Sequence, residues 1–230
     1  MPPRPDLRAS PILCCVTGGD FARESENKFL EHLETLAASG ADWIQIREKH
    51  LSGKNCAALT REALRRVANL RAAGRFAPRI LVNDRLDIAL AAGAHGVHLG
   101  EQSLPLAEVR EFLAKHLANL PASREFLVGV SCHSLESAKS AAKSGADYIF
   151  YGPIFSTPSK AAFGTPQGLT RLQKVCTAID IPVLAIGGIT SENASSCIAA
   201  GAAGLAAIRL FQNADNLQSL ATSLHPQPRQ

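Results

Sequence analysis

One short apolar segment carries three polar side chains at spacings that suit the binding of phosphate. In residues 40–50, GADWIQIREKH, Gln45, Arg47 and Lys49 alternate with apolar or acidic neighbours. Side chains two positions apart in a β-strand lie on the same face, so Gln45 and Arg47 should lie together, opposite the isoleucines of the segment. An arginine can bind two anionic oxygens at once, and a lysine adds a second positive charge. This face therefore predicts a site for a phosphorylated ligand.

Other apolar segments also end in polar side chains or glycines. Asp84 follows one of them, and its carboxylate is a hard oxygen ligand of the kind that Mg²⁺ binds together with substrate phosphates. Gly188 and Arg209 follow the last two segments, where loops can hold a phosphate monoester. Structural explanations compete with these, because Asn83 and Asp84 can cap the next helix and His98 can be a hydrogen-bonded strand histidine.

Four similar passages suggest which elements position these residues. Each passes from an alanine-rich segment through a glycine into a short apolar run, as expected for a helix that ends at a left-handed glycine before a strand. They lie at residues 37–47, 91–100, 141–152 and 199–209. Eight strands are expected in all, at residues 11–17, 42–47, 79–83, 95–99, 127–131, 147–151, 182–186 and 204–208.

Amphipathic helical segments fit between these strands, for example at residues 27–39 and 53–73. Eight strands that alternate with helices predict a (β/α)₈ TIM barrel in a single domain. A doubly wound open sheet is the alternative. It usually carries a G-x-G-x-x-G sequence after its first strand, and VTGGD at residues 16–20 lacks that spacing.

The carboxyl ends of the strands form the active-site face of such a barrel, so the polar strand ends should converge there. The cations Arg47, Lys49 and Lys160, with Asp84, suit a diphosphate. The backbone around Gly188 suits a monophosphate. The residues by themselves therefore predict an enzyme that joins or rearranges phosphorylated small molecules.

The composition describes a globular chain with an ordinary charge balance. Of its 230 residues, 46% are hydrophobic and 19% are charged, and the net charge is +4. The positive charges form no basic block and no apolar run approaches a membrane span, so we expect neither a nucleic-acid partner nor a membrane. The six cysteines form no C-x-x-C pair, which indicates a reduced, cytoplasmic setting. We expect a barrel at residues 11–222 between polar tails at 1–10 and 223–230.

Six motifs in order, QIREK, VND, GVHLGE, GVSCHS, GPIFSTPSK and AIGGIT, resemble the thiamine-phosphate synthase family over about residues 11–210. The resemblance implies a TIM barrel. It also implies an alkyl transferase that couples hydroxymethylpyrimidine diphosphate to hydroxyethylthiazole phosphate, with Mg²⁺ as cofactor, and releases pyrophosphate. A homodimer is left open.

The resemblance also implies roles for particular residues. Asp84 matches a Mg²⁺ ligand, and Arg47, Lys49 and Lys160 would act on the leaving diphosphate. The pyrimidine diphosphate would contact residues of four strand ends, namely Gln45, Ile46, Arg47, Glu48, Lys49, Asn83, Ser131 and Lys160. The thiazole phosphate would contact Thr157, Pro158, Ser159, Gly188, Ile208 and Arg209.

Two departures from the family pattern concern metal and phosphate binding. Ser103 stands where the family usually has a second Mg²⁺-binding aspartate, and Arg209 stands where it often has a serine. The thiazole tautomerases of the same family are an alternative, with His133 as general acid and base. A thiamine-precursor binder without turnover is a third interpretation. Residues 159–168, SKAAFGTPQG, are the candidate for a loop that closes over the thiazole site.

Overall fold

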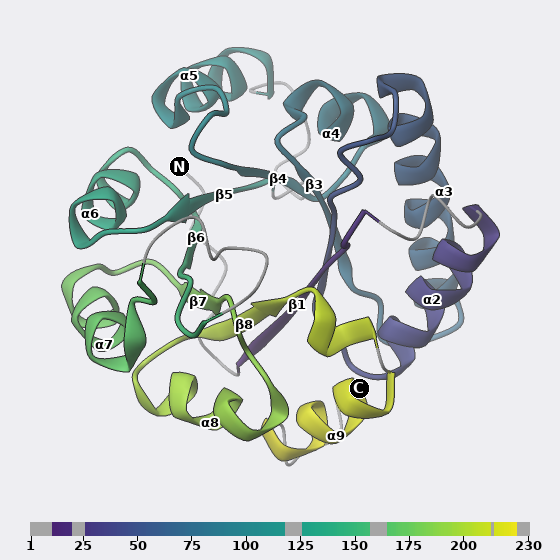
Figure 1. Cartoon of the computed structure of the whole chain (residues 1–230). Coiled ribbons are helices and arrows are strands. Elements are labelled where there is room, and N and C mark those ends of the chain that lie inside the picture. The colour runs from purple at the N-terminus through teal and green to yellow at the C-terminus, as the bar shows by residue number, and fades with distance from the viewer. Residues whose placement is uncertain (1–10, 20–25, 118–125, 157–164, 213, 225–230) are drawn as a thin grey trace.

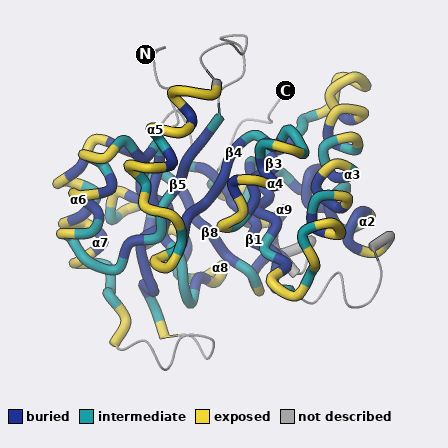
Figure 2. The backbone as a smooth tube through the Cα atoms, turned by 90° about the horizontal axis from the view of Figure 1, so that it is seen from above, coloured by how far each residue is buried: buried dark blue, intermediate teal, exposed yellow. Residues whose placement is uncertain are grey.

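The computed structural model describes residues 11–19, 26–117, 126–156, 165–212 and 214–224. Eight parallel strands pair in sequence order, and β8 pairs with β1 to close a barrel (Figure 1). Helices surround this barrel, and burial decreases from the strands to the outer helix faces (Figure 2). The predicted (β/α)₈ barrel is therefore confirmed, and the open-sheet alternative is wrong.

All eight strands lie within one residue of their expected bounds. They are β1 (Ile12–Val16), β2 (Trp43–Ile46), β3 (Arg79–Asn83), β4 (Gly96–Leu99), β5 (Leu127–Cys132), β6 (Tyr148–Tyr151), β7 (Val183–Ile186) and β8 (Gly204–Ala207). The helices are α2 (Glu26–Ala38), α3 (Gly53–Ala72), α4 (Leu86–Ala92), α5 (Leu106–Leu117), α6 (Leu135–Lys143), α7 (Gly168–Ala178), α8 (Ser191–Ala199), the 3₁₀ helix η2 (Arg209–Gln212) and α9 (Ala214–Leu224). No described helix is long and apolar enough to cross a membrane.

The four similar passages are the turns from α2, α4, α6 and α8 into the following strand. A glycine with positive φ ends each helix, at Gly40, Gly93, Gly145 and Gly201, with φ of 96°, 82°, 91° and 96°. These left-handed conformations are costly for residues that have a Cβ atom. The repeated glycine therefore has the backbone role that its sequence position predicts.

In three of the four passages, the residue two positions after the helix-ending glycine accepts a hydrogen bond from a strand backbone at the amino-terminal face of the barrel. Asp42 accepts a hydrogen bond from the backbone N–H of Leu13 at 2.7 Å. Asp147 accepts one from Val128 at 2.7 Å, and the ring of His95 accepts one from Ile80 at 2.9 Å. In the fourth passage this position is alanine, whose side chain has no acceptor. Three of the four repeats therefore fix the start of a preceding strand with a side-chain acceptor.

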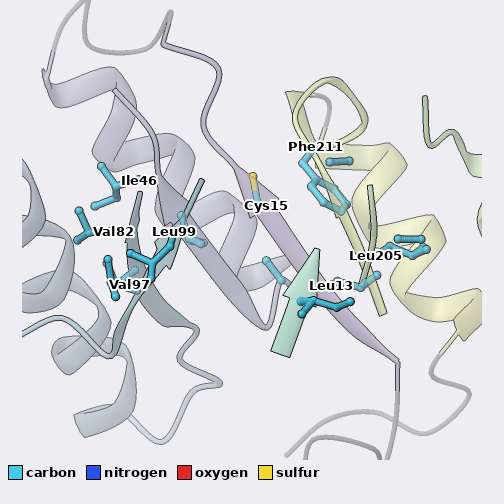
Figure 3. Packing of buried hydrophobic residues seen from close by; sticks show 14 of the residues in the cluster. Leu13, Cys15, Ile46, Val82, Val97, Leu99, Leu205 and Phe211 are labelled. Atoms are coloured by element: carbon cyan, nitrogen blue, oxygen red, sulfur yellow. The ribbon is translucent and has the colours of Figure 1, made fainter. Parts of the chain in front are cut away.

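Apolar side chains pack in two layers separated by the strands. Outward-facing residues such as Leu13, Ile46 and Leu205 belong to the cluster between strands and helices (Figure 3). The barrel interior holds a smaller cluster that includes Trp43 and Tyr148, whose ring centroids are 4.7 Å apart. Because successive strand residues alternate between the two layers, polar residues in register with the inner cluster point into the barrel.

Candidate active site

Gln45 and Asn83 form a hydrogen-bonded pair at the carboxyl ends of β2 and β3. The Gln45 side-chain amide donates to Oδ1 of Asn83 at 2.9 Å, and Gln45 is only 1% exposed. Its own Oε1 is buried and has no hydrogen-bond partner among the described residues. A buried amide oxygen without a partner is rare in proteins, because the lost hydration is not replaced. This oxygen is therefore suited to accept a hydrogen bond from a ligand.

His98 lies between Ser131 and Tyr148 inside the barrel. Its Nε2 is 3.0 Å from Oγ of Ser131, and its Nδ1 is 3.2 Å from the hydroxyl of Tyr148. Burial lowers the pKa of His98 from 6.5 to about 3, so the ring is neutral at physiological pH. The interpretation of His98 as a hydrogen-bonded strand histidine is confirmed, and one of its partners is a predicted site residue.

Asp84 is held by the loop that follows the neighbouring strand. Ser103 Oγ donates a hydrogen bond to the Asp84 carboxylate and accepts one from the backbone N–H of Gly100 at 2.7 Å. Asp84 has a positive φ of 65°, unusual for a residue with a Cβ atom. The helix-cap alternative is wrong, because the N-cap residue of α4 is Arg85 and not Asn83 or Asp84.

The segment after Gln45 combines charged residues of very different exposure. Arg47 is partly buried, and its backbone N–H donates to the side chain of Thr17 at 2.8 Å. Lys49 is exposed, whereas the side chain of Glu48 is buried and its two oxygens have no hydrogen-bond partner in the described part of the chain. Nδ1 of His50 lies 3.8 Å from Oε2 of Glu48. Two cationic residues therefore flank a buried carboxylate.

The ends of β7 and β8 bring backbone groups together. Gly188 has φ of 69°, and a Cβ atom there would lie 2.7 Å from Cβ of Phe155. The side chain of Asn193 donates to the Gly188 carbonyl at 2.9 Å. Ile208 and Arg209 follow β8, and Arg209 begins η2. A short helix after the last strand is a common phosphate-binding element in barrels of this type.

The family of the chain follows from a match to known sequences. The family model described as thiamine monophosphate synthase matches residues 13–211. The chain belongs to the thiamine monophosphate synthase family. The resemblance found in its motifs is thereby confirmed.

Members of the thiamine monophosphate synthase family are similar to the chain over most of its length. A putative thiamine-phosphate synthase of Geobacter sulfurreducens is 46% identical over 76% of both chains. A thiamine-phosphate synthase of Chlorobium luteolum is 39% identical over 94% of this chain and 92% of the relative. A solved structure of a thiamine phosphate pyrophosphorylase from Pyrococcus furiosus has a TM-score of 0.77 and 26% identity, and covers 96% of this chain and 100% of that one.

Some predicted site residues are not part of the geometry described above. Thr157, Pro158, Ser159 and Lys160 fall outside the described residues, as does most of the proposed closing loop at 159–168. The side chain of Ile46 packs in the outer apolar layer, so only its backbone can face the barrel mouth. The predicted tail at 1–10 and residues 225–230 of the predicted tail at 223–230 are also outside the described part. The helix α9 continues to Leu224, two residues beyond the expected boundary at 222.

Two residues at the site were not recognised from the sequence. Thr17 accepts the Arg47 backbone N–H, and Tyr148 bonds to His98. The signal for Tyr148 was a hydroxyl in an otherwise apolar strand, because a buried tyrosine usually finds a hydrogen-bond partner. Thr17 gave no comparable signal, since threonine is common in strands.

The carboxylate of Asp84 fits a magnesium ion whose remaining ligands come from the substrate. In the ranges that the structure describes, no three His, Cys, Asp or Glu side chains are arranged to hold a metal. Mg²⁺ is usually held by one or two carboxylates together with substrate phosphates and water, so a protein-only cluster is not required. Asp84 is exposed and only its Oδ1 is bonded to Ser103, which leaves Oδ2 for a cation.

Proposed function

We propose that the chain joins hydroxymethylpyrimidine diphosphate to hydroxyethylthiazole phosphate, giving thiamine phosphate and pyrophosphate. The observation that supports this most is the buried Gln45 Oε1, an acceptor without a described partner at the active-site end of the barrel. The exocyclic amine of an aminopyrimidine is a donor that suits it. The family and its relatives named as synthases support the same reaction.

The diphosphate would bind beside the hydrogen-bonded pair of Gln45 and Asn83. Arg47 and Lys49 lie just after the end of β2, the strand that carries Gln45, and Lys160 would add a third cation. Asp84 would hold Mg²⁺, which supplies positive charge to the leaving pyrophosphate when it is bound. Thiazole phosphate would bind at Thr157, Pro158, Ser159, Gly188, Ile208 and Arg209.

The chemistry would proceed by displacement at the pyrimidine methylene carbon. The carbon–oxygen bond breaks and its electron pair leaves with pyrophosphate, while Arg47, Lys49 and Lys160 stabilise the charge on the leaving group. The thiazole nitrogen then donates its lone pair to the carbon and forms the carbon–nitrogen bond. The chain's main tasks would be to neutralise the leaving group, orient both rings and exclude water.

Product formation from the two phosphorylated precursors tests this proposal directly. We expect thiamine phosphate and pyrophosphate in equal amounts, only when both precursors are present and with loss of activity in a chelator. Gln45→Ala should lower kcat/KM by about tenfold or more. The variant loses one hydrogen bond to the ligand and also the hydrogen bond that orients Asn83. Gln173→Ala, an exposed change on α7, is the matched control. No product from folded protein would refute the proposal.

One observation favours a second activity, thiazole tautomerisation. His133 Nδ1 is hydrogen bonded to the carbonyl of Gly152, and its Nε2 lies 3.5 Å from Oε1 of Glu101. An Nδ1–H donated to a carbonyl leaves Nε2 as a base for proton transfer. Interconversion of thiazole phosphate tautomers without pyrimidine or Mg²⁺, lost in His133→Asn, would support it. A chain that binds both precursors without either reaction would be a binder.

We also propose that the enzyme is cytoplasmic, and the homodimer that the family resemblance leaves open is for measurement to decide. The six cysteines are all free and five of them are buried, which suits a reducing compartment. Sedimentation of the purified protein tests the dimer, and fractionation of cells tests the compartment.

A further inference from the structure

Three neighbouring strands contribute to one hydrogen-bonded chain inside the barrel. His98 of β4 contacts Ser131 of β5 at 3.0 Å through Nε2 and Tyr148 of β6 at 3.2 Å through Nδ1. The imidazole stacks on Phe150 with ring centroids 4.0 Å apart, which fixes its plane. A Cβ atom on Gly129 would lie only 2.0 Å from the Tyr148 ring, so this glycine makes room for the phenol. The chain thus runs from the barrel interior to a residue at the barrel mouth.

The direction of these hydrogen bonds follows from the burial of Tyr148. Its phenol is 0% exposed, and His98 is its one hydrogen-bond partner among the described residues. A buried hydroxyl proton needs an acceptor, so the phenol donates to Nδ1. Neutral imidazole carries a single N–H, which must then be on Nε2. Nε2–H therefore donates to Ser131 Oγ.

We propose that Tyr148 and His98 are positioning residues that make Ser131 a hydrogen-bond donor to the bound substrate. Because Oγ accepts from the imidazole, the hydroxyl proton of Ser131 is directed away from His98. Ser131 is partly exposed, and its side chain has no other described partner. The Ser131 proton is therefore available to a ligand acceptor, such as a ring nitrogen of the pyrimidine. Only this ligand assignment rests on the proposed function.

This arrangement allows the site to select ligands by the hydrogen-bonding group that they present to Ser131. The imidazole and phenol are held by packing, so the hydroxyl is oriented before the ligand arrives. A ligand that presented an N–H at the same point could bond only to the second lone pair of Ser131 Oγ, and the Ser131 proton would then have no acceptor. Sites built in this way reject such ligands more strongly than apolar pockets do.

The tautomer is measurable in the free protein by nitrogen NMR. With ¹⁵N-labelled histidine, His98→Gln identifies the His98 signals among the seven histidines. We expect a protonated Nε2 and an unprotonated, hydrogen-bonded Nδ1. Tyr148→Phe should shift the Nδ1 signal toward that of a free imidazole nitrogen. Tyr151→Phe makes the same change on the same strand but removes a bond to Gln167 outside the barrel, so it should leave the signal unchanged.

Kinetics test whether His98 acts through Ser131. His98→Met should lower kcat/KM for the diphosphate by about three- to tenfold, whereas His98→Gln keeps an N–H near the Nε2 position and should restore most of it. In a double-mutant cycle, His98→Met combined with Ser131→Ala should be no slower than Ser131→Ala alone.

Two results would overturn the inference. A protonated Nδ1 in the unsubstituted protein would reverse the chain and make Ser131 an acceptor. Additive effects of His98→Met and Ser131→Ala would make His98 a structural residue. Because the NMR result needs no substrate, it stands or fails separately from the proposed reaction, which is refuted only by lack of product.

Discussion

Ser103 donates a hydrogen bond to the carboxylate of Asp84, and this bond joins the loop after β4 to the loop after β3. The serine hydroxyl also accepts the N–H of Gly100, so its orientation is set by the backbone. In the family pattern this position is usually an aspartate, which would add a carboxylate to the site. In this chain Ser103 provides a neutral hydrogen-bond donor instead. The candidate cation site therefore has one carboxylate, that of Asp84, and Ser103 holds it in place.

Ser103→Asp should strengthen Mg²⁺ binding because it places a second carboxylate beside Asp84. We expect the Mg²⁺ dissociation constant, measured by calorimetry with bound pyrophosphate, to fall by about tenfold. Without Mg²⁺ the variant should be less stable, since two like charges lie close together. Ser140→Asp, an exposed change on α6, controls for the added charge. Equal Mg²⁺ affinities for both variants would contradict a cation site at Asp84.

Gly188→Ala should impair the β7 loop through contact as well as through backbone strain. Its Cβ would lie 2.7 Å from Cβ of Phe155, whereas Gly74 has the same φ of 69° and nothing within 4 Å. Gly74→Ala therefore measures the strain alone, about 1 kcal/mol. We expect Gly188→Ala to lose about 1–3 kcal/mol more of the free energy of unfolding and to raise KM for thiazole phosphate. Similar losses in both variants would argue against the close contact.

His98 should make the folded state less stable as the pH falls. Its pKa is 6.5 in the unfolded chain and about 3 in the folded protein, because burial disfavours the charged ring. Between these values the unfolded state binds one more proton, so stability is full above pH 6.5 and falls toward about pH 3. The slope is at most about 1.4 kcal/mol per pH unit.

Urea denaturation of His98→Gln at several pH values checks this expectation. The variant should show a shallower loss of stability between pH 6.5 and about 3 than the unsubstituted protein. His116→Gln makes the same change at an exposed position on α5. Parallel curves for His98→Gln and the unsubstituted protein would mean that His98 titrates normally in the fold.

Asp147→Ala should destabilise the barrel from its amino-terminal face. Its carboxylate accepts the N–H of Val128 at 2.7 Å and pairs with Arg110 at 2.6 Å. Removing it leaves a backbone donor and a partly buried cation without this partner, so we expect a loss of about 2–4 kcal/mol in urea unfolding. Glu111→Ala breaks an exposed pair with Lys115 and should cost less than about 0.5 kcal/mol. A loss below about 1 kcal/mol for Asp147→Ala would show that water replaces both contacts.

Local patterns were sufficient to predict the strands and the barrel. Apolar runs after glycines such as Gly40 and Gly145 mark the strand starts, because a left-handed helix end and a buried strand each depend on a few adjacent residues. The side of β2 on which Gln45 lies was also predictable, since strand residues alternate with period two. The motifs at these strand ends were sufficient to indicate the family.

What only the tertiary structure decided is which side chains are bonded to each other. The bond from Ser103 to Asp84 spans 19 residues, and those from His98 to Ser131 and Tyr148 span 33 and 50. Such partners depend on strand register, on side-chain rotamers and on the space left by Gly129, and none of these is encoded within one segment. The sequence therefore determined the architecture and the kinds of residue at the barrel mouth. The closed barrel decided their partners, because it brings distant strand ends within hydrogen-bond distance.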